Sequence, residues 1–121
     1  MSKDYPKSIK RLIRQYLEQA YERELHRELS KLDQSFTEWR EGAIGSGELS
    51  DRIHQYETKP SRELWKRYNN GEAGTTLAYV IVGGVLDRDE IPPELLEALE
   101  RPLSFYQSLK DRGELREPGD L

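Results

Sequence analysis

The chain has 121 residues and a net charge of −4, and 35% of its residues are charged while another 35% are hydrophobic. This length suits one domain with a modest core, and these proportions favour a folded chain with a heavily solvated surface. Because there is no cysteine, disulfides, thiolate catalysis and cysteine-ligated zinc are excluded. No run approaches the roughly 20 apolar residues of a membrane-spanning helix, and no signal-peptide pattern follows the start, so we expect a soluble, cytoplasmic protein.

The charge is distributed unevenly along the chain. The first 14 residues hold five basic side chains and one acidic one, a net charge of +4, whereas the remaining residues hold 14 basic and 22 acidic side chains, a net charge of −8. Such a basic start could face anionic lipid, nucleic acid or an acidic partner. We favour the alternative that it faces the acidic body of its own fold or of a second copy.

The first predicted element is one long helix from about Pro6 to about Glu41. Strong helix formers fill this segment, residues 8–34 contain neither glycine nor proline, and Gly42 supplies a stop. At about 100° per residue, its apolar side chains form two groups on faces roughly 140° apart. The two groups are Ile9, Leu12, Ile13, Tyr16, Leu17 and Ala20, and then Tyr21, Leu25, Leu29, Leu32, Phe36 and Trp39.

Two interpretations of these faces stay open. The helix breaks near Asp33–Ser35, where Ser35 and Glu38 match a capping box, and folds both faces onto one core. Alternatively it is continuous, extends beyond a compact domain of this size, and leaves one apolar face for a partner. We favour the second interpretation and predict a homodimer. The predicted interface residues are Ile9, Ile13, Tyr16 and Ala20.

The middle of the chain predicts a flexible link and two short helices. Residues 42–47 contain three glycines. One helix then runs from about Glu48 to about Glu57, and a second covers Arg62–Asn69, with acidic residues early and basic residues late as the helix dipole prefers. Between them, Lys59-Pro60-Ser61 interrupts the helical pattern. We expect the two helices to meet there at a corner.

The most hydrophobic segment is TTLAYVIVGGVL, Thr75–Leu86. Residues 79–82 have strand propensity, but no other segment reads as a partner strand, so we predict a buried helix at the centre of the core. Leucine-rich helices follow Pro92 and Pro102, and the last ends at Gly113. The sequence therefore predicts an all-α fold, with residues 1–113 as a single domain of five or six helices and 114–121 as a flexible tail.

The run IHQYETKPSRELWKRYN, which begins at Ile53, resembles a run found in uncharacterised small bacterial all-helical proteins. The resemblance extends more loosely over Thr75–Leu86 and the leucine-rich helix after it. It implies a helical fold and no particular activity, and it carries no site residues over to this chain.

One candidate metal site lies around His54. Asp51 and Glu57 are three residues to either side of it, and one imidazole nitrogen with two carboxylate oxygens suits a divalent metal. His26 and Glu22 form a second carboxylate–histidine pair. Helical metal sites usually combine ligands from several helices, and such pairs are expected by chance among 23 acidic residues. We therefore favour histidines without a metal and expect no cofactor.

The expected corner at Pro60 also permits a helix-turn-helix over residues 48–70, in which Arg62, Lys66 and Arg67 would face DNA. Against this, the turn lacks the usual glycine, Glu63 would lie in the reading surface, and the chain is acidic. The sequence has no nucleophile elbow and no phosphate-binding glycine loop, so an enzyme with a site near His54 is less favoured. We predict a protein that acts through protein–protein contacts, including self-association.

Overall fold

The computed structural model describes residues 5–121, and over this range the chain forms helices joined by turns, with no strand. The predicted all-α fold with a long N-terminal helix is confirmed. None of the helices in this range combines the length and the apolar character that crossing a membrane requires. The α-helices are α1 (Lys7–Arg40), α2 (Ser46–Tyr56), α3 (Arg62–Asn69), α4 (Ala73–Val82), α5 (Pro93–Ala98) and α6 (Glu100–Asp111).

The first helix, α1, is continuous over 34 residues, which makes it about 50 Å long at about 1.5 Å per residue. The capping box considered at Ser35 does not form. Ser35 Oγ donates to the carbonyl of Lys31 and accepts a hydrogen bond from Arg52 at 3.2 Å, and Glu38 also binds Arg52, at 3.0 Å. Since neither side chain accepts a hydrogen bond from a backbone N–H, the helix is not capped there. It continues to its last turn, and Gly42, with a φ of 79°, follows its end.

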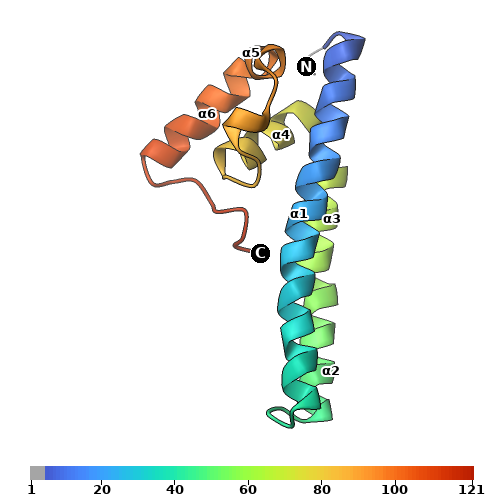
Figure 1. Ribbon diagram of the computed structural model, residues 1–121. Coiled ribbons are helices and arrows are strands. Elements are labelled where there is room, and N and C mark those ends of the chain that lie inside the picture. Colours follow the sequence, from blue (N-terminus) through green and yellow to red (C-terminus); the bar gives the residue numbers. More distant parts are fainter. Residues whose placement is uncertain (1–4) are drawn as a thin grey trace.

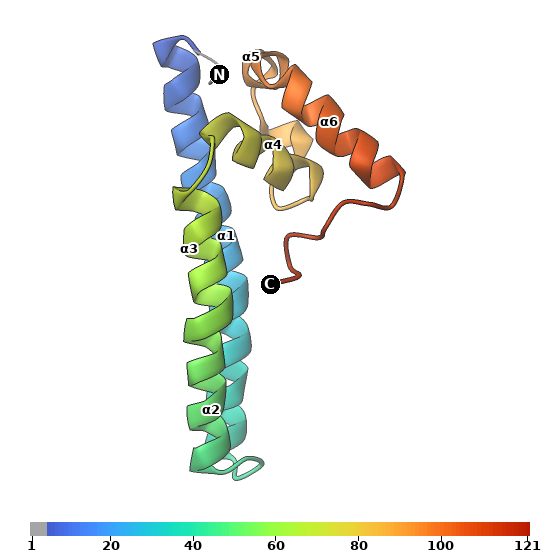
Figure 2. The ribbon, with the colours of Figure 1, turned by 180° about the vertical axis from the view of Figure 1, so that it is seen from behind.

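The helices α2 and α3 and the turn between them form a single rod that runs back along α1, and we call α1 and this rod the hairpin (Figures 1 and 2). The corner that we predicted at Lys59-Pro60-Ser61 is therefore wrong. Pro60 has no N–H, and in a regular α-helix its ring would collide with the carbonyl of Tyr56. A π-helical turn over Glu57–Ser61 accommodates the proline with one extra residue, so α2 passes into α3 without a change of direction.

The most hydrophobic helix, α4, lies at the centre of the core, as predicted. Six of its ten residues are buried, and it packs against α6 and the N-terminal half of α1. The strand alternative for residues 79–82 is excluded because α4 extends through them. The buried hydrophobic cluster comprises Ile13, Ala20, Leu77, Ala78, Val80, Ile81, Val82, Leu86, Ile91, Leu95, Leu99 and Leu103.

Residues 73–111, here called the head, lie beside the part of α1 nearest its N-terminus, and the other end of the hairpin extends well beyond them (Figure 1). Polar contacts fix this position. Arg23 donates to the carbonyl of Val85 at 3.0 Å and pairs with Glu90 at 2.6 Å, and Tyr16 donates to the carbonyl of Glu90 at 3.2 Å. The hydrogen bonds from Arg23 and from the Asp87 backbone lower the pKa of the Glu90 carboxyl.

The C-terminal residues 114–121, predicted as a flexible tail, contact α3 and α4. Pro118 is buried, and its carbonyl accepts a hydrogen bond from Arg67 at 3.1 Å. Tyr79 donates its hydroxyl proton to the carbonyl of Arg116. A side chain at Gly83 would collide with the Pro118 ring, so this glycine allows the close approach. Two backbone carbonyls of the segment therefore have side-chain donors from these helices.

Candidate functional site

The residues of the candidate metal site are not brought together. Asp51, His54 and Glu57 are all exposed. Three-residue steps along a helix rotate by about 60° each, so the first and last of them point about 120° apart. Within residues 5–121, no group of three or more histidine, aspartate or glutamate side chains could hold a metal ion. The second histidine, His26, is also exposed.

Replacing His54 with alanine is expected to change the free energy of unfolding by less than about 1 kcal/mol, because the side chain is exposed. Metal content, measured by mass spectrometry on purified protein, is expected to be at background in the unmodified protein and in the variant. Stoichiometric zinc, iron or manganese that disappears in the variant would contradict this expectation.

The helix-turn-helix alternative is wrong, because the turn on which it depends is absent and the two helices form one rod. The three basic residues also differ in their surroundings. Arg62 is exposed, and Lys66 lies 4.0 Å from Glu63 on the outer surface. Arg67 instead points into the molecule, where it pairs with Glu24 at 2.6 Å. The three do not form a common basic surface.

The predicted interface residues already have partners in their own chain. Ile13 and Ala20 are buried, with 3% and 0% of their surface exposed, and Ile9 and Tyr16 pack against the same core cluster. All four therefore contact the core of their own chain, and the dimer interface predicted for them stays a prediction. The head covers this face of α1, so only the second apolar group of α1 is left for a partner.

A cluster around Glu24 joins α1 to α3 and to the C-terminal segment. The Glu24 carboxylate is 1% exposed, and Arg67 Nη1 donates to both of its oxygens, at 2.6 and 2.8 Å. The hydroxyl of Tyr68 donates to the same carboxylate at 2.6 Å. Burial, and then the hydrogen bond to Glu24, raise the pKa of Tyr68. The cluster gives a buried negative charge a cation and a neutral donor, which is the arrangement that such a charge requires.

The inward face of α1 is continuous, but it turns polar beyond Ala20. Glu24, Glu28 and Ser35 are the buried residues of that half of the helix, and on a helical wheel they lie close to the line of Ile13 and Ala20. Arg67 pairs with Glu24, Lys31 with Glu28, and Arg52 with Ser35. Sequence reasoning missed these residues because it followed apolar side chains alone. Their helical spacing from Ile13 was the available signal.

Three apolar side chains of that half of α1 lie on another side, about 100° round the helix from the polar inward face: Leu25, Leu29 and Phe36. On the opposite rod, Arg67 donates to the carbonyl of Pro118, and Arg52 lines a hollow together with Leu121, so both point to the side of the C-terminal segment. Ile53 lies about 100° round the rod from Arg52, and Trp65 about 160° round it from Arg67. Both sets therefore lie on the side of the hairpin away from that segment. We call this surface the open flank; it comprises Leu25, Leu29, Phe36, Ile53 and Trp65.

Comparison with known proteins adds no relative. The chain matches no family model, no curated protein and no solved structure. The likeness of the run that begins at Ile53 to small bacterial helical proteins therefore stays an interpretation of the sequence.

Proposed function

We propose that this protein acts through protein–protein contacts and that its first partner is a second copy, bound along the open flank. The observation that carries the proposal is the exposure of large apolar side chains on that surface: Leu29 is 47% exposed, Ile53 39% and Trp65 55%. Apolar surface in water costs about 25 cal/mol per Å². A row of such side chains along one flank is typical of an interaction surface.

The shape of the hairpin favours a second copy as the occupant. Within residues 5–121, α2 is the helix that packs against the far end of α1. Two helices bury only the sides that face one another. Two hairpins packed flank to flank form a four-helix bundle, which gives every helix two neighbours. A two-fold axis lets the same stripe serve on both copies.

Charge favours an antiparallel pair. The described start of α1 carries Lys7, Lys10, Arg11 and Arg14 and no acidic residue; Lys3 and Asp4 of the basic start lie outside the described residues. The tip of the hairpin, residues 38–52, carries four acidic and two basic side chains. In an antiparallel pair, the basic start of one copy lies beside the acidic tip of the other, which guides association and fixes the orientation.

The double variant Leu29→Glu with Ile53→Glu is expected to weaken dimerisation by at least about a hundredfold, because it places four carboxylates at the apolar contact. Both positions are exposed in the single chain, so far-ultraviolet circular dichroism is expected to be unchanged. Sedimentation velocity over a concentration series measures the shift toward monomer.

The matched control is Ser30→Glu with His54→Glu, which adds the same charge one residue away from each position. Both of these residues are exposed and lie off the open flank. The control is expected to sediment like the unmodified protein. Equal sedimentation of all three proteins would contradict binding through the open flank.

A further inference from the structure

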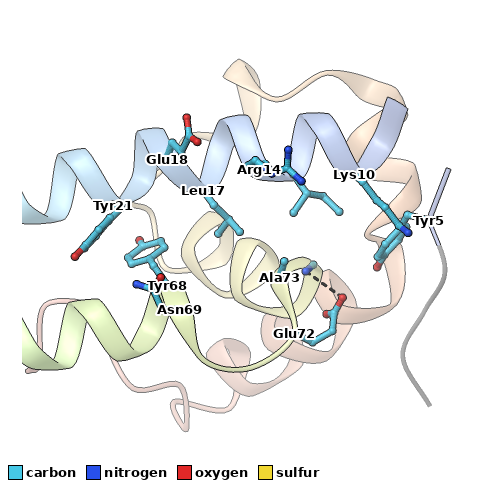
Figure 3. A pocket seen from close by; sticks show the side chains of 12 residues that line it. Tyr5, Lys10, Arg14, Leu17, Glu18, Tyr21, Tyr68, Asn69, Glu72 and Ala73 are labelled. Atoms are coloured by element: carbon cyan, nitrogen blue, oxygen red, sulfur yellow. Dashed lines mark hydrogen bonds between the residues drawn. The ribbon is translucent and has the colours of Figure 1, made fainter. Parts of the chain in front are cut away.

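A slot lies between the N-terminal half of α1 and the connection from α3 to α4 (Figure 3). Its volume is about 520 Å³, within the range of roughly 300–1,000 Å³ that is typical of small-molecule sites. Apolar side chains line it between the two ends, among them Ile13, Leu17 and Ala73. The slot belongs to one copy of the chain and does not depend on self-association.

Aromatic rings form both ends of the slot. Tyr5 lies at one end, against Gly74, where an added Cβ would come within 2.9 Å of the Tyr5 hydroxyl oxygen. At the other end, the ring centroids of Tyr21 and Tyr68 are 4.9 Å apart, with their planes 31° from parallel. Figure 3 shows Leu17 and Ala73 between these ends. Since the Tyr68 hydroxyl is bound to Glu24, this residue offers its ring to the slot.

The charges at the slot are arranged asymmetrically. Arg14 lines the slot, is exposed, and forms no ion pair within residues 5–121. Lys10 lies one turn before it on α1. Two carboxylates, those of Glu18 and Glu72, also line the slot. That of Glu72 accepts hydrogen bonds from the backbone N–H groups of Gly74 and Thr75, at 3.1 and 2.6 Å. The N-terminus of α4 therefore already has its capping group, and the cationic side of the slot is that of α1.

We propose that the slot binds a small aromatic molecule that carries one carboxylate. Its ring lies between the tyrosine ends, where aromatic side chains favour offset or edge-to-face contacts. Its carboxylate pairs with the guanidinium of Arg14, whose planar fork matches two carboxylate oxygens. A singly charged group fits better than a phosphate, because Glu18 and Glu72 also line the slot and offset part of the positive charge.

Titration with 2-naphthoate and with the uncharged 2-naphthylmethanol tests the proposal, followed by backbone amide shifts in nuclear magnetic resonance spectra. Naphthoate is expected to bind about tenfold more tightly than the alcohol. The shifts are expected at Leu17, Tyr68 and Ala73–Gly74. The absence of binding at millimolar probe, or shifts confined to other parts of the chain, would overturn the proposal.

Two variants separate the roles of charge and shape. Arg14→Gln is expected to lower naphthoate affinity about tenfold, to the level of the alcohol, and Ala73→Phe is expected to abolish binding of both probes by filling the slot. The matched control is Arg11→Gln, which removes the same charge from an exposed residue that does not line the slot. Equal affinities in the Arg14 and Arg11 variants would show general charge attraction and overturn the assigned site.

Discussion

Replacing Arg67 with alanine is expected to lower the free energy of unfolding by about 3–5 kcal/mol. The substitution leaves the Glu24 carboxylate, which is 1% exposed, without its cation. It also removes the hydrogen bond to the Pro118 carbonyl that holds the C-terminal segment. Urea denaturation followed by circular dichroism, at one protein concentration for all variants, measures the change.

Two comparisons separate the buried charge from general effects of the substitution. Arg62→Ala, at an exposed position of the same helix, is expected to change the free energy of unfolding by less than about 0.5 kcal/mol. Adding Glu24→Gln to Arg67→Ala is expected to recover part of the lost stability, because a neutral amide needs no counter-charge. If the two substitutions are additive, the double variant is less stable than Arg67→Ala by as much as Glu24→Gln lowers the stability of the unmodified protein. Such additivity would contradict the coupling between Glu24 and Arg67.

Replacing Ile13 with glutamate is expected to prevent folding of the domain. Ile13 is 3% exposed and belongs to the buried cluster around α4. A carboxylate there loses its hydration without gaining a partner, a cost of several kcal/mol against a total stability of about 5–15 kcal/mol. Circular dichroism and the dispersion of amide resonances measure the loss of structure.

The control for this substitution is Gln15→Glu, which places the same charge on an exposed position of α1 and is expected to leave the fold unchanged. A folded Ile13→Glu protein with the mass of one chain would contradict the placement of Ile13 in the core. That result would instead support the interface role that the sequence suggested for this residue.

Local sequence signals predicted the elements that depend on neighbouring residues. The absence of glycine and proline from residues 8–34 indicated the long first helix, and the apolar run at Thr75–Leu86 indicated the helix at the centre of the core. The corner predicted at Pro60 was wrong because that prediction relied on the rule that a proline usually ends a helix. Here α1 lies along the whole rod, and packing against it supports a π turn where an isolated helix would stop.

Two of the contacts that sequence reasoning missed, Glu24 with Arg67 and Ser35 with Arg52, join residues far apart in the chain. Glu24 reads as one of many surface carboxylates until the hairpin brings Arg67, 43 positions later, against it. The helical wheel likewise gave the angle between the two apolar faces of α1, but not which of them the head would cover. The head covers the face of Ile13, so the exposed face is that of Leu29.

Sedimentation equilibrium of the unmodified protein at tens of micromolar tests the central claim most directly. We expect a species of twice the mass of one chain, because the open flank exposes Leu29, Ile53 and Trp65 together on each copy. A single species with the mass of one chain over this concentration range would contradict self-association through that surface.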